Sequence, residues 1–322
     1  MMMNWDNPFY SRMPDPVGMI KASDYQMPIV RIPSKILSPG LHDEDIRLYA
    51  MAAFFAPPGN GKRIPAEKML STALASGRIK PGGTLVEPTS GGTGVAFAYL
   101  AARQGIKVVA IVSDRLVEGK LLPLVRHGAT VLKESEAVRF LGLEKSPGSL
   151  ELARLYAEKT EAVFLNQYWN RDNPGGWREI APQIWSMLGD NLTAAFFALG
   201  STGTMRGLGG FFKEQNPGVQ IVATMPYLSQ EIAGTRDRKR LKDVMPWQDL
   251  VDFQDVTDFR VAQALSAELF ATTGLPGGES SGALLGIVDH YYLEQLAAGT
   301  LRDKNIAFMV FIDTFVPYVK MA

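Results

Sequence analysis

The chain has 322 residues, which is enough for two domains of ordinary size. Its 33 Lys and Arg residues balance 33 Asp and Glu residues, so a nucleic-acid binder, which needs a net basic field, is not expected. Cysteine is absent, which excludes disulfides, thiolate nucleophiles and cysteine-ligated zinc or iron–sulfur sites.

The sequence offers no membrane-spanning segment, because its most apolar region, residues 194–210, is broken by five glycines and by Arg206. The first 24 residues lack the basic, apolar and small-residue order of a secretion signal. His42, His127 and His290 lie far apart in the sequence, so no metal site is expected. We therefore expect a soluble, cytoplasmic protein that binds neither nucleic acid nor membrane.

From residue 84 onwards the dominant pattern is an apolar strand, a glycine-rich turn and an amphipathic helix, repeated. Residues 107–113 (KVVAIVS) form a continuous apolar run, which is typical of a strand buried on both faces. Two successive strand–helix–strand units predict a parallel sheet covered by helices. The predicted elements of this part are strands at 84–87, 107–113 and 129–132 and helices at 95–104 and 116–127.

The same pattern returns in the second half of the chain. The stretch at 166–176 is rich in Asn, Gly and Pro, which predicts a long connection near the boundary between two halves. Residues 235–242 carry five basic side chains, and either a solvated face or an anion-attracting lid fits them. Strands are predicted at 162–165, 194–199, 220–224, 256–259 and 307–312, and helices at 180–188, 205–215, 260–272 and 282–298.

Three turns combine glycine with Ser or Thr: TSGGTG at 89–94, GSTGTMRG at 200–207 and GESSGA at 278–283. Small residues let backbone N–H groups converge in such a turn, and the start of a helix adds positive potential. Three of them in one chain indicate an anionic ligand held by backbone and hydroxyl groups. None matches the G-x-G-x-x-G dinucleotide pattern, so a nicotinamide cofactor is not favoured.

Lys62 follows the Pro/Gly turn at 57–61 and precedes an apparent helix. One interpretation is a phosphate-binding P-loop, but Ala56 stands where its first glycine belongs and Arg63 where its magnesium-binding hydroxyl belongs. A second interpretation is a lysine nucleophile. A third is an ordinary surface lysine.

Four segments, in their order and spacing, resemble the cysteine synthase and cystathionine β-synthase family of pyridoxal-phosphate enzymes. VEPTSGGTG at 86–94 resembles the family's TSGNTG loop, and LNQYWNRDNPGGW at 165–177 resembles its NQ-containing connection. ALGSTGTMRG at 198–207 resembles the GTGGT phosphate loop, and GESSGALLG at 278–286 resembles GISSGA. The match covers roughly residues 28–313.

The resemblance implies the tryptophan synthase β-subunit-like fold, an α/β protein of two three-layer domains with parallel-type sheets. It places a smaller domain at 47–159 and a larger, cofactor-binding domain at 1–46 plus 160–322. It also implies pyridoxal 5'-phosphate as the cofactor, a small amino acid as the substrate and a homodimer as the assembly.

The resemblance also implies a role for individual residues. Lys62 falls where the family has its catalytic, cofactor-linking lysine, and Ser280 where a hydroxyl faces the pyridine nitrogen. Gly92 replaces the asparagine that contacts the cofactor's phenolic oxygen. The cofactor phosphate would be held by Gly200, Ser201, Thr202, Gly203 and Thr204. The substrate carboxylate would be held by Thr89, Ser90, Gly91 and Thr93, with Gln167 as a second contact.

The implied reaction is β-replacement on an O-activated serine, which forms cysteine or a related β-substituted alanine with Lys62 as the base. The alternative is β-elimination to pyruvate and ammonia, as a cysteine or serine desulfhydrase or dehydratase performs it. A further alternative is a non-catalytic homologue that binds a partner, because Gly92 and the residues around Lys62 differ from the family pattern.

Overall fold

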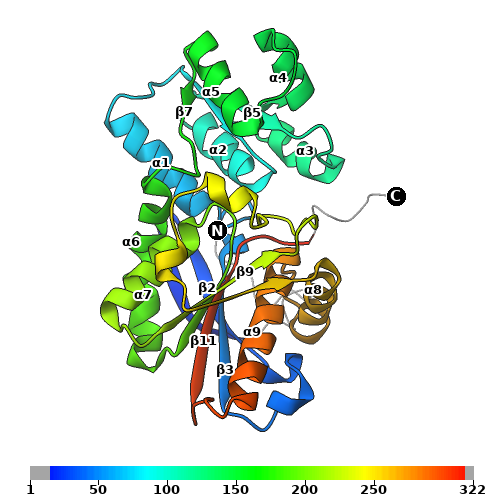
Figure 1. Ribbon diagram of the computed structural model, residues 1–322. Helices are drawn as coiled ribbons and strands as arrows, with labels where there is room; N and C mark the ends of the chain where they lie inside the picture. The colour runs from blue at the N-terminus through cyan, green and yellow to red at the C-terminus, as the bar shows by residue number, and fades with distance from the viewer. Residues whose placement is uncertain (1–14, 316–322) are drawn as a thin grey trace. The chain divides into compact units, whose positions relative to one another are not determined.

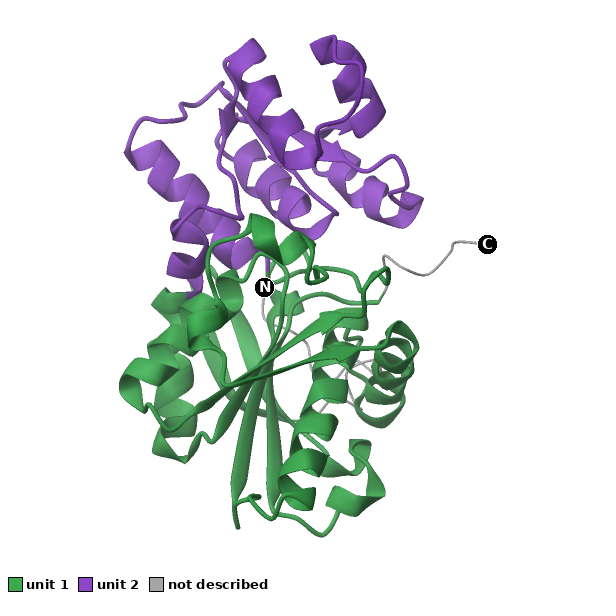
Figure 2. Cartoon of the chain, in the orientation of Figure 1, with its two compact units in different colours: residues 1–61, 178–315 green, residues 62–177, 316–322 purple. Residues whose placement is uncertain are grey.

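A computed structural model describes residues 15–315 (Figure 1). They form two compact units, a larger one of residues 15–61 with 178–315 and a smaller one of residues 62–177 (Figure 2). The chain therefore divides at 61/62 and 177/178, whereas the sequence predicted 46/47 and 159/160. Residues 1–14 and 316–322, which the sequence assigns to the larger domain, lie outside the described part.

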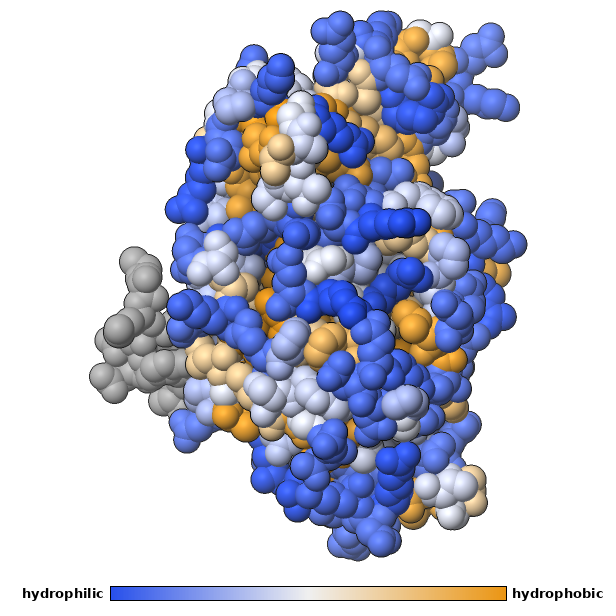
Figure 3. Space-filling model, turned by 90° about the vertical axis from the view of Figure 1, so that its left-hand side faces the viewer, coloured by the Kyte–Doolittle hydropathy of each residue, from blue (hydrophilic) through white to orange (hydrophobic). Residues whose placement is uncertain are grey.

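Within residues 15–315 no helix combines the length and the apolar character that crossing a membrane requires. On the face shown in Figure 3, hydrophobic side chains occur in patches between hydrophilic ones.

The smaller unit contains a parallel sheet covered by helices on both faces. Its strands are β4 (Thr84–Pro88), β5 (Lys107–Val112), β6 (Thr130–Lys133) and β7 (Val163–Phe164), in the spatial order β6-β5-β4-β7. Its helices are α1 (Arg63–Ala75), α2 (Gly92–Ala102), α3 (Glu118–Arg126), α4 (Glu134–Leu141) and α5 (Ser149–Thr160).

Strand β5 shows why this unit has three layers. Val108, Ala110 and Val112 pack with residues of α1, α2 and α3, whereas Val109 and Ile111 pack with residues of α4 and α5. Because successive side chains of a strand point to opposite faces, the continuous apolar run of β5 covers both sides of the sheet.

The larger unit contains a mixed sheet with strand order β1-β2-β3-β11-β8-β9-β10. The strands are β1 (Pro16–Ala22), β2 (Tyr25–Ile32), β3 (Ile46–Ala52), β8 (Ala194–Ala198), β9 (Gln220–Pro226), β10 (Phe253–Thr257) and β11 (Asn305–Phe311). β2 pairs antiparallel with β1 and β3, and the other neighbours pair parallel. The helices are α6 (Asp172–Leu188), which begins in the smaller unit, α7 (Gly210–Gln215), α8 (Phe259–Thr273) and α9 (Glu279–Ala297).

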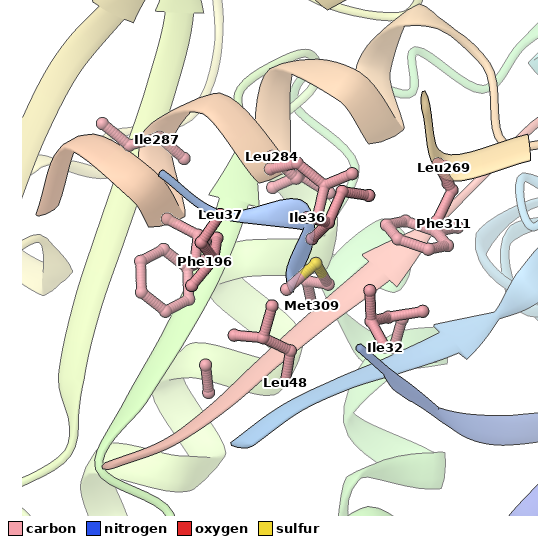
Figure 4. Packing of buried hydrophobic residues seen from close by; sticks show 14 of the residues in the cluster. Ile32, Ile36, Leu37, Leu48, Phe196, Leu269, Leu284, Ile287, Met309 and Phe311 are labelled. Atoms are coloured by element: carbon pink, nitrogen blue, oxygen red, sulfur yellow. The ribbon is translucent and has the colours of Figure 1, made fainter. Parts of the chain in front are cut away.

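Strand β11 lies at the centre of the larger unit's core. Its Met309 and Phe311 join a cluster with Leu284 of α9 and Leu269 of α8 (Figure 4). Phe308 points to the other face of the sheet, where its ring centroid lies 5.9 Å from that of Phe212 in α7. The sheet is therefore the middle of three layers, as the sequence predicted.

The α/β architecture with parallel-type sheets is confirmed, and most predicted strands begin and end within two residues of the observed ones. The strand predicted at 256–259 was misplaced, because Asp258 caps α8 by accepting the N–H of Arg260. The predicted connection at 166–176 is wrong in its second half, because α6 begins at Asp172. Pro174 falls in its first turn, where the helix needs no N–H donor.

The prediction missed the three strands β1 to β3, as well as α4 and α5. The signal in β2 is weakened by Pro28, which cannot donate to a sheet ladder and usually argues against a strand. The helix predicted at 95–104 begins earlier, at Gly92, since the glycine turn itself supplies the first helical residues.

A buried carboxylate at the end of β4 holds the segment that follows β7. Glu87 is fully buried and accepts the backbone N–H of Gln167 (2.9 Å) and of Asn166 (3.1 Å). Burial raises the pKa of Glu87 to about 8, although these hydrogen bonds act in the opposite direction. The carboxyl group therefore stabilises the loop but is costly to bury in its charged form.

Helices α8 and α9 approach each other closely at Gly282. A Cβ atom at this position would lie 1.8 Å from the carbonyl oxygen of Ala262. That obstacle is backbone, so it cannot rotate away as a side chain could. Four residues further along α9, a Cβ atom on Gly286 would meet only side-chain atoms at 3.4 Å.

We expect Gly282→Ala to destabilise the protein by about 2–3 kcal/mol, because the two helices must move apart. Gly286→Ala, on the same helix, should stay within about 1 kcal/mol of wild type, since an ordinary contact replaces open space and alanine favours the helix. Urea unfolding followed by fluorescence measures both. Equal stabilities of the two variants would contradict the close approach.

We expect Glu87→Gln to change how stability depends on pH. In the wild type the folded-state pKa of about 8 lies above the ordinary 4.5, so stability falls as the pH rises from about 5 to 8. The glutamine variant lacks this loss. Between pH 5 and 9 its free energy of unfolding should therefore rise relative to that of the wild type by on the order of 3 kcal/mol. Unfolding free energies at several pH values test this, with the exposed Glu144→Gln as control; parallel curves for wild type and Glu87→Gln would refute it.

Candidate functional site

The turn after β4 forms the start of α2 and is held by its own threonine. The Thr89 Oγ1 atom accepts the N–H groups of Gly91 (3.0 Å) and Gly94 (3.1 Å). Gly91 has a φ of 135°, a conformation that favours glycine, and Gly92 is the first helical residue. Ser90 is exposed at the tip. The helix start and these hydroxyl groups can attract an anion, although the oxygen of Thr89 already accepts two bonds.

Gln167 is brought to this turn from a distant part of the chain. Thr93 donates its hydroxyl to Gln167 Oε1 (2.8 Å), and Gln167 Nε2 donates to the carbonyl oxygen of Pro88 (3.2 Å). Its backbone N–H is bound by Glu87. Both Thr93 and Gln167 are buried. The amide is therefore held in one orientation beside the first turn of α2.

Lys62 lies directly before the first residue of α1. The preceding residue, Gly61, donates its N–H to the carbonyl oxygen of Ile312 (2.7 Å), just after the end of β11. The chain thus leaves the larger unit at the carboxyl end of β11, and Lys62 is the next residue.

In the larger unit, the turn at residues 200–204 follows the carboxyl end of β8. A Cβ atom on Gly200 would lie 2.3 Å from the carbonyl oxygen of Gly234, so only glycine fits there. Thr202 has a φ of 63°, and its buried hydroxyl has no hydrogen-bond partner among residues 15–315. A π-helix, Met205–Gly209, follows the turn, and such distortions are frequent at functional sites.

The basic segment at 235–242 is joined through its backbone to the residue that precedes this turn. Arg236 donates its N–H to the carbonyl oxygen of Leu199 (2.8 Å). Arg240 pairs with Asp237 (3.4 Å) and approaches Glu231 (3.7 Å). Part of the segment's positive charge is therefore neutralised locally.

Ser280 lies in the first turn of α9 and donates its hydroxyl to Asp313 Oδ1 (3.1 Å). Asp313 also accepts the N–H of Gly278 through its carbonyl oxygen (3.0 Å). Because β8 and β11 are parallel neighbours, Ser280, Asp313 and the 200–204 turn lie at the same edge of the larger sheet. The hydroxyl proton of Ser280 is committed to a carboxylate, which leaves its oxygen as an acceptor.

Each unit thus gathers part of the predicted site. The smaller unit holds Lys62, the turn at 89–93 and Gln167; the larger unit holds the turn at 200–204 and Ser280. Sequence reasoning missed the roles of Glu87 and Asp313. The available signal was a charged residue at the end of each of two buried apolar strands, where a side chain must find polar partners.

Comparison with known proteins places this geometry in a family. Residues 25–311 match the model of the family described as pyridoxal-phosphate dependent enzyme. Cysteine synthase B of Escherichia coli (strain K12) is 32% identical over 230 residues, which are 70% of this chain and 73% of that protein. Cysteine synthase B of Pseudomonas aeruginosa is 35% identical over 181 residues, which span 56% of this chain and only 58% of that protein.

A solved structure, O-ureido-L-serine synthase, superposes with a TM-score of 0.78 at 25% identity, covering 92% of this chain and 91% of that one. The family match spans both units, and the architecture of both agrees with it. The chain belongs to the family of pyridoxal-phosphate dependent enzymes.

Proposed function

We propose that this protein catalyses β-replacement on an O-activated serine and forms cysteine or a related β-substituted alanine. The observation that carries the proposal is the turn at 200–204, whose buried Thr202 hydroxyl has no partner among the described residues. The relatives support the same reaction class, because their names describe cysteine synthases and an O-ureido-L-serine synthase.

The turn at 200–204 fits the phosphate of pyridoxal phosphate. Ser201 and Thr202 are buried, and Gly200 has no room for a side chain. The Thr202 hydroxyl is a donor whose burial without a partner costs free energy, and a phosphate oxygen would remove that cost. We assign Gly200, Ser201, Thr202, Gly203 and Thr204 to the phosphate, Gly92 to the ring's phenolic side and Ser280 to the pyridine nitrogen.

Lys62 is assigned as the residue that binds the cofactor covalently and moves the proton at the substrate's Cα. When bound, pyridoxal phosphate supplies an electron-withdrawing ring that stabilises negative charge at that carbon. The lysine amine accepts the Cα proton in its neutral form and returns it after the new bond has formed at Cβ. The membership in a pyridoxal-phosphate dependent family supports this role for Lys62 over that of a P-loop lysine.

The turn at 89–93 is assigned to the substrate carboxylate. The start of α2 attracts a negative charge and Ser90 adds an exposed hydroxyl group, while the Thr93 hydroxyl is the donor that positions Gln167. Gln167 is held beside the turn by Thr93, so it meets the substrate in a preset orientation.

The homodimer and the cytoplasmic location stay predictions. They rest on the family resemblance and on the absence of cysteine from the sequence.

We expect purified protein supplied with the cofactor to absorb near about 410 nm and to lose that band on borohydride reduction. Peptide mass spectrometry should then find the reduced cofactor on Lys62. Lys62→Ala should show no covalent product, whereas the exposed Lys80→Ala should behave as wild type. A reduced adduct on another lysine would refute the assignment of Lys62, and a protein that binds no cofactor would favour the non-catalytic homologue.

O-acetyl-L-serine with and without sulfide separates replacement from elimination. Replacement predicts cysteine formation that needs sulfide, with little pyruvate in either sample, because the nucleophile completes the reaction at Cβ. Elimination predicts pyruvate and ammonia at similar rates whether or not sulfide is present. Cysteine and pyruvate assays on the same samples decide between the two.

A further inference from the structure

A polar cavity lies in the larger unit, away from the residues assigned above. It has a volume of about 140 Å³ and is lined from the amino ends of β8, β9 and β11 and from the last turns of α9. The turn at 200–204 and Ser280 lie at the carboxyl edge of the same sheet. The cavity is therefore at the opposite edge, and nothing in the proposed reaction uses it.

Tyr292 of α9 lines this cavity and carries a buried hydroxyl. Its side chain is 1% exposed, and its hydroxyl makes no hydrogen bond of ordinary geometry among residues 15–315, while the Thr193 hydroxyl lies close enough to interact with it. The nearby Thr193 hydroxyl donates to the carbonyl oxygen of Ile306 and accepts its N–H, both at 2.9 Å. Burial raises the pKa of Tyr292, so its phenol stays neutral and keeps a proton to donate.

Arg302 supplies a positive charge to the same cavity. It is exposed, and none of the described carboxylates lies within ion-pair distance (4.0 Å) of its guanidinium. Arg302 is not required as a hydrogen-bond donor to the last carbonyl groups of α9. Backbone N–H groups of residues 298–301 already bind the carbonyl oxygens of Glu294, Gln295 and Leu296. Asn305 fixes the backbone at Arg302 by donating its side-chain amide to the Arg302 carbonyl oxygen (2.7 Å).

The remaining lining favours an anion over a cation. Thr300 donates to the Gln295 Oε1 atom (2.7 Å), which leaves the nitrogen of that amide as a further donor. The carboxylate that acts on the Tyr291 phenol is Asp252, and it is already paired with Lys213 (2.7 Å). A neutral phenol, a guanidinium and an amide nitrogen match the two oxygens of one carboxylate.

We propose that this cavity binds a small carboxylate anion, with Arg302 and the Tyr292 hydroxyl as donors to its oxygens. A single guanidinium suits one negative charge rather than the two of a phosphate dianion. The volume admits a short organic acid but no large ligand. The site is distinct from the turn at 89–93, which we assign to the substrate's own carboxylate.

The test is a titration of the cofactor-loaded protein with sodium propionate, followed by NMR of tyrosine labelled with ¹³C at Cζ. Tyr292→Phe identifies the signal of Tyr292. We expect this signal to move in a saturable way at millimolar propionate, and to move little with uncharged propionamide. Arg302→Gln should raise the half-saturating concentration of propionate about tenfold, because it removes a charge-assisted hydrogen bond.

Two variants make the result specific. Lys304→Gln removes the same charge two residues away without altering the cavity lining, so it should change half-saturation by less than about twofold. Gln167→Ala should leave the Tyr292 response intact, because it alters only the substrate turn. The proposal fails if the signal does not move up to about 0.1 M propionate. It also fails if propionamide acts equally, or if Lys304→Gln weakens binding as much as Arg302→Gln does.

Discussion

Parallel strand pairing is the constraint on which the arrangement of the functional residues depends. In the smaller unit β4, β5, β6 and β7 are parallel, and in the larger unit β3, β11, β8, β9 and β10 are. Parallel strands end at the same edge, so the loops that follow them gather there. The turn at 89–94 and the turn at 200–204 each occupy that edge of their own sheet.

Hydrogen bonds from buried polar groups then hold these loops in place. In the smaller unit, Glu87 binds two backbone N–H groups and Thr93 binds the Gln167 side chain. In the larger unit, Ser280 binds Asp313. A buried acceptor that lost its partners would incur a desolvation cost, so each bond favours a single loop conformation. A binding site that must hold its groups before the ligand arrives benefits from such restraint.

Helix α9 connects the two edges of the larger sheet. Ser280 lies at its first turn, beside the carboxyl ends of the strands, and Tyr292 lies near its other end, beside the amino ends. The close contact of Gly282 with Ala262 anchors this helix against α8. The same element thus carries a residue assigned to the cofactor and a residue of the carboxylate cavity that we propose.

From residue 84 onwards the order of strands, glycine turns and helices, apart from α4 and α5, was predictable from sequence, because apolar runs and glycine or proline positions are local signals. The family resemblance likewise rests on short segments. Local patterns did not reveal the strands before residue 53, where Pro28 interrupts the β2 signal.

Only the tertiary structure decided which distant groups meet. Thr93 and Gln167 are 74 residues apart, and Ser280 and Asp313 are 33 apart. Arg302 and Tyr292 share a cavity with Thr193, which lies 109 and 99 residues earlier in the chain. Such contacts depend on strand register and on what packing leaves buried without a partner. Both are properties of the folded chain that no short stretch of sequence encodes.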